Sequence, residues 1–496
     1  MSTDSVSDAA RAARKPRSEN EIVARKPRSG DEIELSIERL DARGCGIAHR
    51  DGIEFTVRHA LPGDTVRVRV LKRQRGRVRA HALDVISKSP SRVPARCAHF
   101  GTCGGCSFQD LGYAAQLSEL HALVVDAFAA RELRVPIEAV QPASELYGYR
   151  NKMEFTFSNR RWIETGEPAG VDASFALGLH AAERFQKVID IDACGIQHPV
   201  ANEILASARG LAREAGLAPW DVRAHTGLLR YLMIRVAHTT NEVLVNLVTS
   251  SESPAEIDPY LRRLCERHPD VTTCVQNVNA KLASTSIGQS ERVHHGPGVI
   301  HEALCGVRFA ISANSFFQTN TRQAERLFEM VREEAALTGR ETVLDLYCGT
   351  GSLGLVLASR AARVIGMEQV PEAIADARRN AAQNGIAHAE FHAGDVLALL
   401  RAGDVPRADV LVVDPPRAGL HPRVLPLLAA TGARRIVYVS CNPESGARDA
   451  AELARQGYRL ARVRPIDLFP HTPHVESVLR LDRADAGTID VARAAT

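Results

Sequence analysis

Short segments of alternating apolar and polar residues open the patterned part of this chain. From about Glu32, segments such as IELSIERL and DTVRVRVLKRQRGRVRAHALDVI alternate at period two and are broken by Gly-Asp and Asp-Gly turns. Such alternation places successive side chains on opposite faces of a strand, and the turns return each strand to a neighbour. The pattern predicts a small antiparallel barrel over residues 31–90.

The next part, residues 91–309, combines one helical segment with several strand-like runs. The stretch YAAQLSELHALVVDAFAA predicts a helix near residues 110–130, which we expect to pack on the C-terminal domain. The runs NKMEFTFSN, EVLVNLVTS and TTCVQNVN predict strands with few helices between them. We therefore expect a central, mainly antiparallel domain.

Strands and helices alternate from Ala310 onward. The strand-like runs ETVLDLYC, RVIGMEQ, AEFHAGD, ADVLVVDPP and RRIVYVSC are separated by helical segments. This order is typical of a doubly wound, Rossmann-like α/β domain, which we place at residues 310–482. Residues 1–30 and 483–496 have the composition of a disordered arm and a tail.

Composition adds limits to this organisation. The 496 residues are too many for one core, and roughly two to four domains are expected. Hydrophobic residues make up 45% and charged residues 24%, as in soluble globular proteins. No apolar run approaches the ~20 residues of a membrane span, and the N-terminus lacks the apolar stretch of a signal peptide. We expect a cytoplasmic, monomeric protein with no membrane partner.

The net charge of +3 indicates no particular partner, but the distribution of cations does. Residues 13–23 and 24–34 are near-duplicates, ARKPRSENEIV and ARKPRSGDEIE, and form a basic arm that either adds loose affinity for nucleic acid or has no role. One predicted hairpin carries cations that would line one face of a strand and suit a phosphate backbone: Arg67, Arg69, Lys72, Arg73, Arg75, Arg77 and Arg79. A merely solvated strand face is the alternative.

Four of the ten cysteines form a candidate metal centre. Cys97, Cys103 and Cys106 follow the spacing C-x5-C-x2-C with glycines between them, and Cys194 follows in IDACGIQH. Four thiolates suit either tetrahedral zinc or an iron–sulfur cluster. Zinc sites more often use two C-x2-C pairs, so three grouped ligands and one distant ligand favour the cluster.

The segment LDLYCGTGSLGL predicts a nucleoside site. Gly349, Gly351 and Gly354 have the spacing G-x-G-x-x-G, which permits close approach of the backbone to a ligand. Glu368 ends the second strand of the α/β domain, where an acid commonly takes the ribose hydroxyls. At this point NAD and S-adenosylmethionine remain alternatives.

Later strand ends separate these alternatives. Asp395 ends the third strand and is suited to an adenine edge, and the fourth strand ends in VVDPPRAGL, a rigid turn that begins with Asp414. The turn is similar to the catalytic loop of methyltransferases that act on nucleobases. The fifth strand delivers Cys441 to the ligand crevice, where it is a candidate nucleophile.

Six motifs together carry a family resemblance. FGTCGGC, FFQTN, DLYCGTG, DPPRAG, SCNP and DLFPHTPHVES resemble, in order and over about residues 32–482, the RNA uridine C5-methyltransferases. The N-terminal barrel resembles the TRAM domain of that family, an OB-like RNA-binding module. A chain that has both a TRAM-like barrel and the cysteine group is most similar to the branch of the family that modifies 23S ribosomal RNA, because the transfer-RNA branch typically lacks both features.

The resemblance implies roles for individual residues. Cys441 would add to C6 of uracil, and Glu476 in PHVES would remove the C5 proton after methyl transfer from S-adenosylmethionine. Phe316 and Phe317 are candidates to stack on a flipped base, with core packing as the alternative for one of them. The family pattern places cofactor contacts on Gln318, Tyr347, Glu368, Asp395 and Asp414. It also implies a [4Fe-4S] cluster on the four cysteines. Because nothing in methyl transfer requires an electron, we expect that cluster to have a structural or RNA-shaping role. With S-adenosylmethionine as the ligand of the loop, we expect Gly354 to be a helix–strand packing residue.

Three other functions remain as alternatives. A transfer-RNA uridine C5-methyltransferase would use the same chemistry on a different RNA. An adenine amino-methyltransferase would need an aromatic residue after Asp-Pro-Pro, where this chain has Arg417, and would have no use for Cys441. A non-catalytic iron–sulfur RNA-binding factor would not need both Cys441 and Glu476.

Overall fold

The computed structural model describes residues 27–74, 76–164, 166–282, 285–403 and 407–484. The basic arm up to residue 26, Arg75 of the basic hairpin and the tail from residue 485 lie outside the described residues. Within the described ranges, no helix has both the length and the apolar character needed to cross a membrane.

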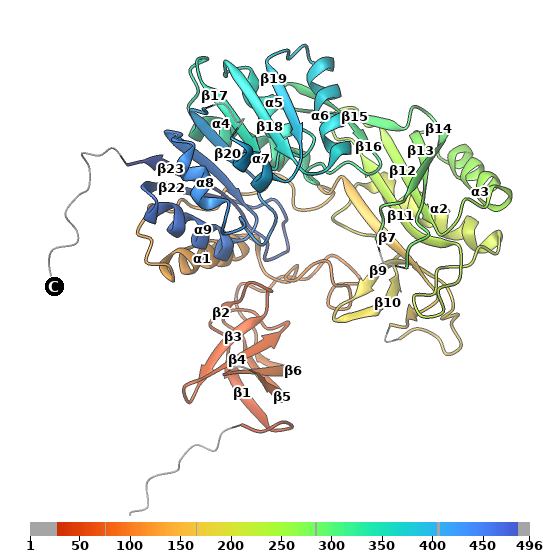
Figure 1. Ribbon diagram of the computed structural model, residues 1–496. Helices are drawn as coiled ribbons and strands as arrows, with labels where there is room; N and C mark the ends of the chain where they lie inside the picture. The colour runs from red at the N-terminus through yellow and green to blue at the C-terminus, as the bar shows by residue number, and fades with distance from the viewer. Residues whose placement is uncertain (1–26, 75, 165, 283–284, 404–406, 485–496) are drawn as a thin grey trace, which may run out of the picture.

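The N-terminal part forms a six-stranded sheet in the order β1-β5-β6-β4-β3-β2, set below the rest of the molecule in Figure 1. Its apolar alternate positions, among them Phe55, Val66 and Val78, are buried in a core of their own. The antiparallel expectation is wrong for one pair: β4 runs parallel to β6, because the intervening β5 carries the chain back across the sheet. The strands are β1 (Glu32–Ser36), β2 (Arg39–Leu40), β3 (Gly46–Arg50), β4 (Ile53–Arg58), β5 (Thr65–Gln74) and β6 (Arg77–Ser87).

The central part forms an eight-stranded sheet in the order β14-β13-β12-β11-β7-β9-β10-β8. Five of its neighbouring pairs are antiparallel, and β12–β13 and β10–β8 are parallel. Its strands are β7 (Lys152–Ser158), β8 (Arg161–Trp162), β9 (Ala176–Ala181), β10 (Arg184–Asp190), β11 (Leu229–Val236), β12 (Val243–Thr249), β13 (Val271–Val278) and β14 (Ser290–His295). The helices α2 (Pro199–Glu214) and α3 (Pro254–Arg267) pack on it, and α3 makes the crossover that the parallel pair β12–β13 requires.

A seven-stranded sheet in the order β19-β18-β17-β20-β21-β23-β22 forms the C-terminal part. Strands β17 to β21 are parallel, and β23 runs antiparallel to both β21 and β22. This is the Rossmann-like methyltransferase fold that the alternation of strands and helices predicts. The strands are β17 (Thr342–Leu346), β18 (Arg363–Glu368), β19 (Ala389–Ala393), β20 (Val410–Val413), β21 (Arg435–Ser440), β22 (Tyr458–Ile466) and β23 (Glu476–Arg483).

Helices cover both faces of this sheet (Figure 1). One buried cluster holds α4 (Thr321–Ala335), α5 (Ser352–Ala358) and α6 (Pro371–Gln383) against it. The opposite cluster holds α7 (Val396–Ala402), α8 (Leu425–Ala430) and α9 (Pro443–Arg455). The helix α1 (Tyr113–Ala129) precedes the central sheet in the chain but packs on α9, so two distant segments share one core.

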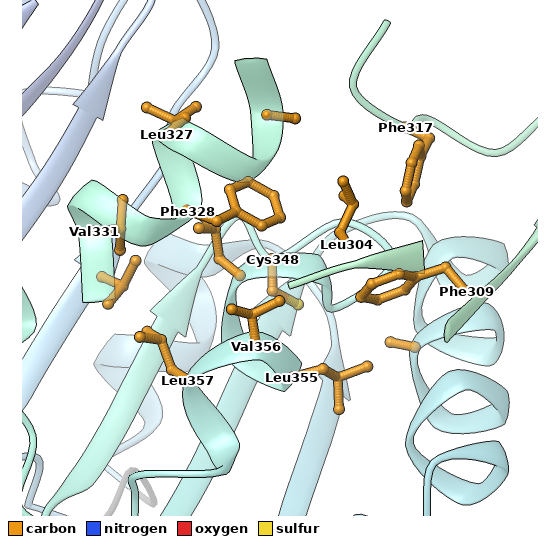
Figure 2. Packing of buried hydrophobic residues seen from close by; sticks show 14 of the residues in the cluster. Leu304, Phe309, Phe317, Leu327, Phe328, Val331, Cys348, Leu355, Val356 and Leu357 are labelled. Atoms are coloured by element: carbon orange, nitrogen blue, oxygen red, sulfur yellow. The ribbon is translucent and has the colours of Figure 1, made fainter. Parts of the chain in front are cut away.

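The first of these clusters is continuous with the hairpin of β15 (Val299–Leu304) and β16 (Val307–Ser312). Figure 2 shows Leu304, Phe309 and Phe317 from this side lying near Phe328 of α4 and Val356 of α5. Full burial of each such side chain contributes about 1.5–3 kcal/mol. The packing ties the loop that follows β16 to the α/β domain.

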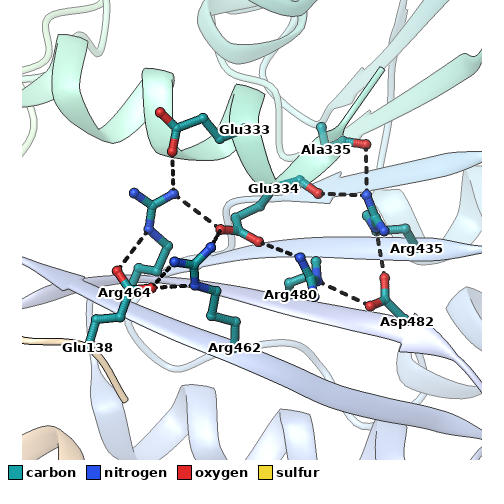
Figure 3. Close-up of polar contacts among 9 residues, drawn as sticks. All are labelled: Glu138, Glu333, Glu334, Ala335, Arg435, Arg462, Arg464, Arg480 and Asp482. Atoms are coloured by element: carbon teal, nitrogen blue, oxygen red, sulfur yellow. Dashed lines mark hydrogen bonds and ion pairs between the residues drawn. The ribbon is translucent and has the colours of Figure 1, made fainter. Parts of the chain in front are cut away.

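A buried carboxylate fastens α4 to the antiparallel edge of the sheet. Glu334 is 2% exposed and faces three arginines on β22 and β23 (Figure 3). Its Oε1 lies 3.1 Å from Nη1 of both Arg462 and Arg464, and its Oε2 lies 3.2 Å from Nη1 of Arg480. A buried carboxylate requires such partners, and here they fix the two strands that follow the parallel core.

Candidate active site

The glycine-rich loop joins β17 to α5 through a left-handed backbone. Tyr347, Gly349 and Gly351 all have positive φ, at 62°, 55° and 79°. A Cβ on Gly354 would stand 2.9 Å from both Asp345 Oδ2 and Val364 Cγ1. The third glycine is therefore a helix–strand packing residue, as the sequence predicts.

The acids predicted to hold the cofactor follow neighbouring strand ends. Glu368 closes β18, where its Oε2 accepts a hydrogen bond from Gly349 N (3.3 Å) and its Oε1 accepts one from Val370 N (2.9 Å). Asp395 caps α7 by accepting from Ala398 N (2.9 Å). Burial, with the charges of Asp395 and Glu368, raises the pKa of Tyr347 to about 12. The structure thus brings Tyr347, Glu368 and Asp395 to one edge of the sheet.

Gln318 approaches from a different segment, the loop between β16 and α4. Its carbonyl accepts a hydrogen bond from Asn151 Nδ2 (3.0 Å), and its side chain is half-buried. Within the described part of the chain, no hydrogen bond links the Gln318 side chain to the strand-end acids. Gln318 therefore remains a predicted cofactor contact.

Asp345 is a buried acid that the sequence prediction missed. It lies inside β17, and its Oδ2 accepts a hydrogen bond from Gly354 N (2.9 Å). Its Oδ1 has no partner among the described residues. Burial, together with the charges of Asp414 and Glu368, raises its pKa to about 8. An acid within the apolar run VLDL is the signal that could have found it.

The predicted nucleophile and base lie on adjacent strands. Ser440 pairs with Ser477 across β21 and β23, so Cys441 follows one member of that pair and Glu476 precedes the other. Asn442 then caps α9 by accepting from Glu444 N (3.1 Å), with Pro443 in the first turn. Cys441 is thus held between a strand end and a helix N-terminus.

Asp414 and Arg417 act on this pair from the neighbouring turn. Burial raises the pKa of Cys441 to about 11 and that of Glu476 to about 8. The charge of Asp414 raises both values, whereas Arg417 lowers both. Asp414 is half-buried, and burial raises its own pKa to about 7. The charge of Asp414 thus acts both on Asp345 of β17 and on the reactive pair.

Arg417 is a second residue that the sequence prediction missed as part of the site. Its Nη2 lies 3.3 Å from His474 Nδ1, and its carbonyl accepts from Asn442 Nδ2 and Ser445 Oγ, both at 3.2 Å. Arg417 thus joins the Asp-Pro-Pro turn, the segment after Cys441 and the loop before Glu476. Its position directly after the Asp-Pro-Pro turn is the sequence feature that could have identified Arg417 as part of the site.

The two phenylalanines before Gln318 have different surroundings. Phe317 is 3% exposed and packs on Phe309 with ring centroids 5.6 Å apart, whereas Phe316 is 69% exposed. Only Phe316 is therefore free to stack on a base. The sequence does not distinguish the two, because a loop has no regular alternation of buried and exposed positions.

The four predicted metal-binding cysteines lie within electrostatic reach of one another. Cys106, Cys194 and Cys97 all contribute to raising the pKa of Cys103, although burial is the main cause and brings it to about 12. Two N–H groups point at sulfur: Gly105 N lies 3.4 Å from Cys103 Sγ, and Gln109 Nε2 lies 3.3 Å from Cys106 Sγ. Across the described ranges, however, no three or more His, Cys, Asp and Glu side chains are arranged to hold a metal ion.

The basic hairpin is less positive than its sequence suggests. Its cations are exposed at alternate positions, but four of them face acids. These ion pairs are Arg67–Asp84 (3.7 Å), Arg69–Glu32 (2.8 Å), Arg77–Glu54 (2.6 Å) and Arg79–Glu183 (2.9 Å). Counting cations along the sequence overestimates the positive charge of this hairpin, because the fold brings acids beside four of them.

Two protein families match the C-terminal part. Residues 337–428 match a family described as a methyltransferase domain, and residues 404–484 match tRNA (Uracil-5-)-methyltransferase. The second match includes Asp414, Cys441 and Glu476.

Similar proteins cover nearly the whole chain. A protein of Porphyromonas gingivalis described as an RNA methyltransferase is 40% identical over 90% of this chain and 99% of its own length. A second, from Caldanaerobacter subterraneus, is 37% identical over 91% of this chain and 99% of its own. The crystal structure of Pyrococcus abyssi tRNA (uracil-54, C5)-methyltransferase, in complex with S-adenosyl-L-homocysteine, is 31% identical with a TM-score of 0.70, covering 90% of this chain and 100% of that one. This chain therefore belongs to the RNA (uracil-5-)-methyltransferase family.

Proposed function

We propose that this enzyme transfers a methyl group from S-adenosylmethionine to C5 of a uridine in RNA, through a covalent bond between Cys441 and C6. The observation that carries the proposal is the placement of Cys441 and Glu476 at facing strand ends, within the field of Asp414 and Arg417. A nucleophile and a base on the same side of a nucleoside-binding sheet are what C5 methylation of uracil requires.

In the first step, the Cys441 thiolate forms a bond from sulfur to C6 of uracil. The electron pair of the C5=C6 double bond moves into an enolate, which makes C5 nucleophilic. Arg417 assists because its charge lowers the pKa of Cys441 and so favours the thiolate. S-adenosylmethionine, when bound, would supply the methyl group, the bond from C5 to the methyl carbon forming as the bond from that carbon to the sulfonium sulfur breaks and S-adenosylhomocysteine is left.

In the last step, the Glu476 carboxylate removes the C5 proton. The electron pair of the C–H bond restores the C5=C6 double bond, and the bond between C6 and sulfur breaks to return the thiolate. Glu476 is 7% exposed, and burial raises its pKa to about 8. A general base is most effective when its pKa lies near the pH at which the enzyme works, so this value suits proton removal close to neutral pH.

The cofactor would lie over the glycine-rich loop. We assign Glu368 to the ribose hydroxyls and Asp395 to the adenine edge, with Tyr347, Gln318 and Asp414 as further contacts. The left-handed loop supports this assignment, because it lets the backbone approach a ligand closely. Phe316, exposed beside Gln318, is the proposed stacking partner of the flipped uracil.

We further propose 23S ribosomal RNA as the substrate, with the six-stranded N-terminal sheet acting as a TRAM-type RNA-binding domain. Lys72 and Arg73, exposed hairpin cations that no ion pair among the described residues engages, and the four cysteines that influence one another support this branch of the family. Transfer RNA is the second candidate, since the Pyrococcus abyssi neighbour is a tRNA (uracil-54, C5)-methyltransferase. Mapping 5-methyluridine in both RNA classes from cells that lack the protein decides between them, because only the true target loses its methyl group.

A [4Fe-4S] cluster on Cys97, Cys103, Cys106 and Cys194 is a separate proposal. The mutual influence of the thiols and the N–H groups aimed at two sulfurs support it. Iron and acid-labile sulfide in anaerobically purified protein test it. Both should be lost in Cys103→Ser and kept in Cys305→Ser, and a metal-free wild type would contradict it.

The covalent mechanism has a direct test with RNA that contains 5-fluorouridine. Fluorine at C5 cannot leave as a proton, so the Cys441 adduct should accumulate and survive denaturing electrophoresis. Cys441→Ala should give no adduct, and Cys305→Ala, which alters a cysteine of the β15–β16 turn, should still give one. An adduct that persists in Cys441→Ala would rule out this nucleophile.

A further inference from the structure

An irregular hairpin in the central sheet pushes three residues out into solvent. In the pairing of β9 with β10, Arg184 faces Ala181, but the next pair is already Val188 with His180. The residues between these pairs, Phe185, Gln186 and Lys187, are left without partners on β9 and are exposed. Strand irregularities of this kind commonly redirect a side chain for a purpose.

Phe185 is the unusual residue of this hairpin. It is 69% exposed, and its ring stacks on that of His180 with centroids 5.0 Å apart and planes 12° from parallel. Burial lowers the pKa of His180, which keeps the imidazole neutral and suited to stacking. His180 therefore covers one face of the Phe185 ring and fixes its orientation.

Two other parts of the chain hold the hairpin in place. The cysteine loop pairs with it: Gly104 N donates to the carbonyl of His180 (3.2 Å), and Ala182 N donates to the carbonyl of Thr102 (2.8 Å). From the N-terminal sheet, Arg79 Nη2 reaches Glu183 Oε1 at 2.9 Å. The β9–β10 hairpin is thus fixed where the N-terminal sheet, the cysteine loop and the central sheet meet.

The surroundings of Phe185 suit a nucleic acid better than a protein. The exposed residues next to it along β10, Arg184, Gln186 and Lys187, are all polar or charged, unlike the apolar centre of a protein interface. Arg184 and Lys187 are exposed beside it, and no ion pair in the described ranges engages either one. Single aromatic rings flanked by cations are the usual means of holding unpaired bases.

We infer that Phe185 is a second base-stacking platform, which holds an unpaired nucleotide of the RNA outside the catalytic site. The inference rests on the proposed RNA substrate. It gives the cysteine loop a role that methyl transfer itself does not supply, because that loop positions the carbonyl of His180 and thus the support of Phe185.

The test measures binding of a fluorescein-labelled oligoadenylate to the full-length protein by fluorescence anisotropy at low salt. Phe185→Ala should weaken binding roughly tenfold, and Phe185→Trp should restore it, because stacking is tolerant of the aromatic used. Val293→Ala, an exposed apolar residue on β14 at the opposite edge of the same sheet, should bind as the wild type does.

Several results would overturn the inference. These are no oligoadenylate binding by the wild type, equal binding by Phe185→Ala, or a loss that tryptophan does not restore. A dimer of the wild type that dissociates in Phe185→Ala would instead make this face a contact between copies. The 5-fluorouridine adduct should form in Phe185→Ala at saturating RNA, and its absence from the wild type would count against the proposed function rather than against the platform.

Discussion

Cys441 and Glu476 face each other across one pair of hydrogen-bonded strands, although 35 positions of sequence separate their numbers. Ser440 and Ser477 form the terminal pair of β21 and β23, and the two reactive residues flank that pair on the same side. The strands are antiparallel, so the end of one meets the start of the other. Strand register alone therefore brings nucleophile and base together.

Replacing Arg417 with alanine should shift the pH dependence of methylation. Both Cys441 and Glu476 must lose a proton before they act, so activity should rise with pH through about 8 as Glu476 ionises and on toward about 11 as Cys441 does. Arg417 lowers both pKa values, and its removal should raise them. The rising limb should move to higher pH, and a shift of one unit reduces the rate at neutral pH about tenfold. Arg423→Ala, exposed in the same turn region, should leave the pH–rate profile in place.

Replacing Glu476 with glutamine should trap the methylated intermediate on ordinary RNA. The amide cannot accept the C5 proton, so Cys441 stays bonded to C6 after methyl transfer. Electrophoresis under denaturing conditions with radiolabelled methyl groups should show label in a protein–RNA complex. Glu444→Gln, exposed at the start of α9, should turn over normally. Free methylated RNA released at the wild-type rate by Glu476→Gln would contradict the role of the base.

Alanine substitution at two adjacent phenylalanines should separate RNA handling from stability. Phe316→Ala should raise the KM for RNA by roughly tenfold or more, because ~1–3 kcal/mol of stacking is lost, and should leave the Tm unchanged. Phe317→Ala opens a cavity beside Phe309 and should cost about 3–5 kcal/mol of unfolding free energy. Denaturant titration and steady-state kinetics on both variants check this, and a stability loss in Phe316→Ala would place that ring in the core.

Gly354→Ala should disturb the glycine-rich loop. The added methyl group would stand 2.9 Å from Asp345 Oδ2 and Val364 Cγ1, so α5 must move away from β17. We expect a loss of roughly 1–3 kcal/mol of stability and weaker binding of S-adenosylhomocysteine in calorimetry. Gly210→Ala is the matched control, because its site in α2 has nothing within 4 Å of the new Cβ. Equal ligand binding by both variants would show that α5 tolerates the shift.

Glu334→Gln should destabilise the antiparallel edge that presents Glu476. The change removes the charge that faces Arg462, Arg464 and Arg480 (Figure 3). We expect a loss of about 3 kcal/mol, the lower end for a broken buried pair, because the arginines keep some access to water. Glu333→Gln, which alters a more exposed partner of Arg464, should cost under about 1 kcal/mol. Denaturant unfolding compares the two variants directly.

Much of the architecture was predictable because it rests on local patterns. Period-two alternation predicted the N-terminal and central strands, and the alternation of strands with helices predicted the Rossmann-like sheet. The parallel pairing of β4 with β6 was not predictable, since pairing depends on which distant strand lies alongside. The packing of α1 on the C-terminal domain was expected from the sequence, and the structure adds that α9 is the helix it contacts.

The sequence by itself determined which chemical groups are present and where they lie along strands: Cys441 after the fifth strand, Glu476 at the start of the last, glycines in the loop. Only the tertiary structure decided what surrounds them. Burial and neighbouring charges set the pKa values of Glu476 and Asp345. The packing of distant segments places Arg417 among the reactive groups and buries Phe317 while exposing Phe316. These properties depend on solvent exclusion and on distances between segments remote in sequence, which no local pattern encodes.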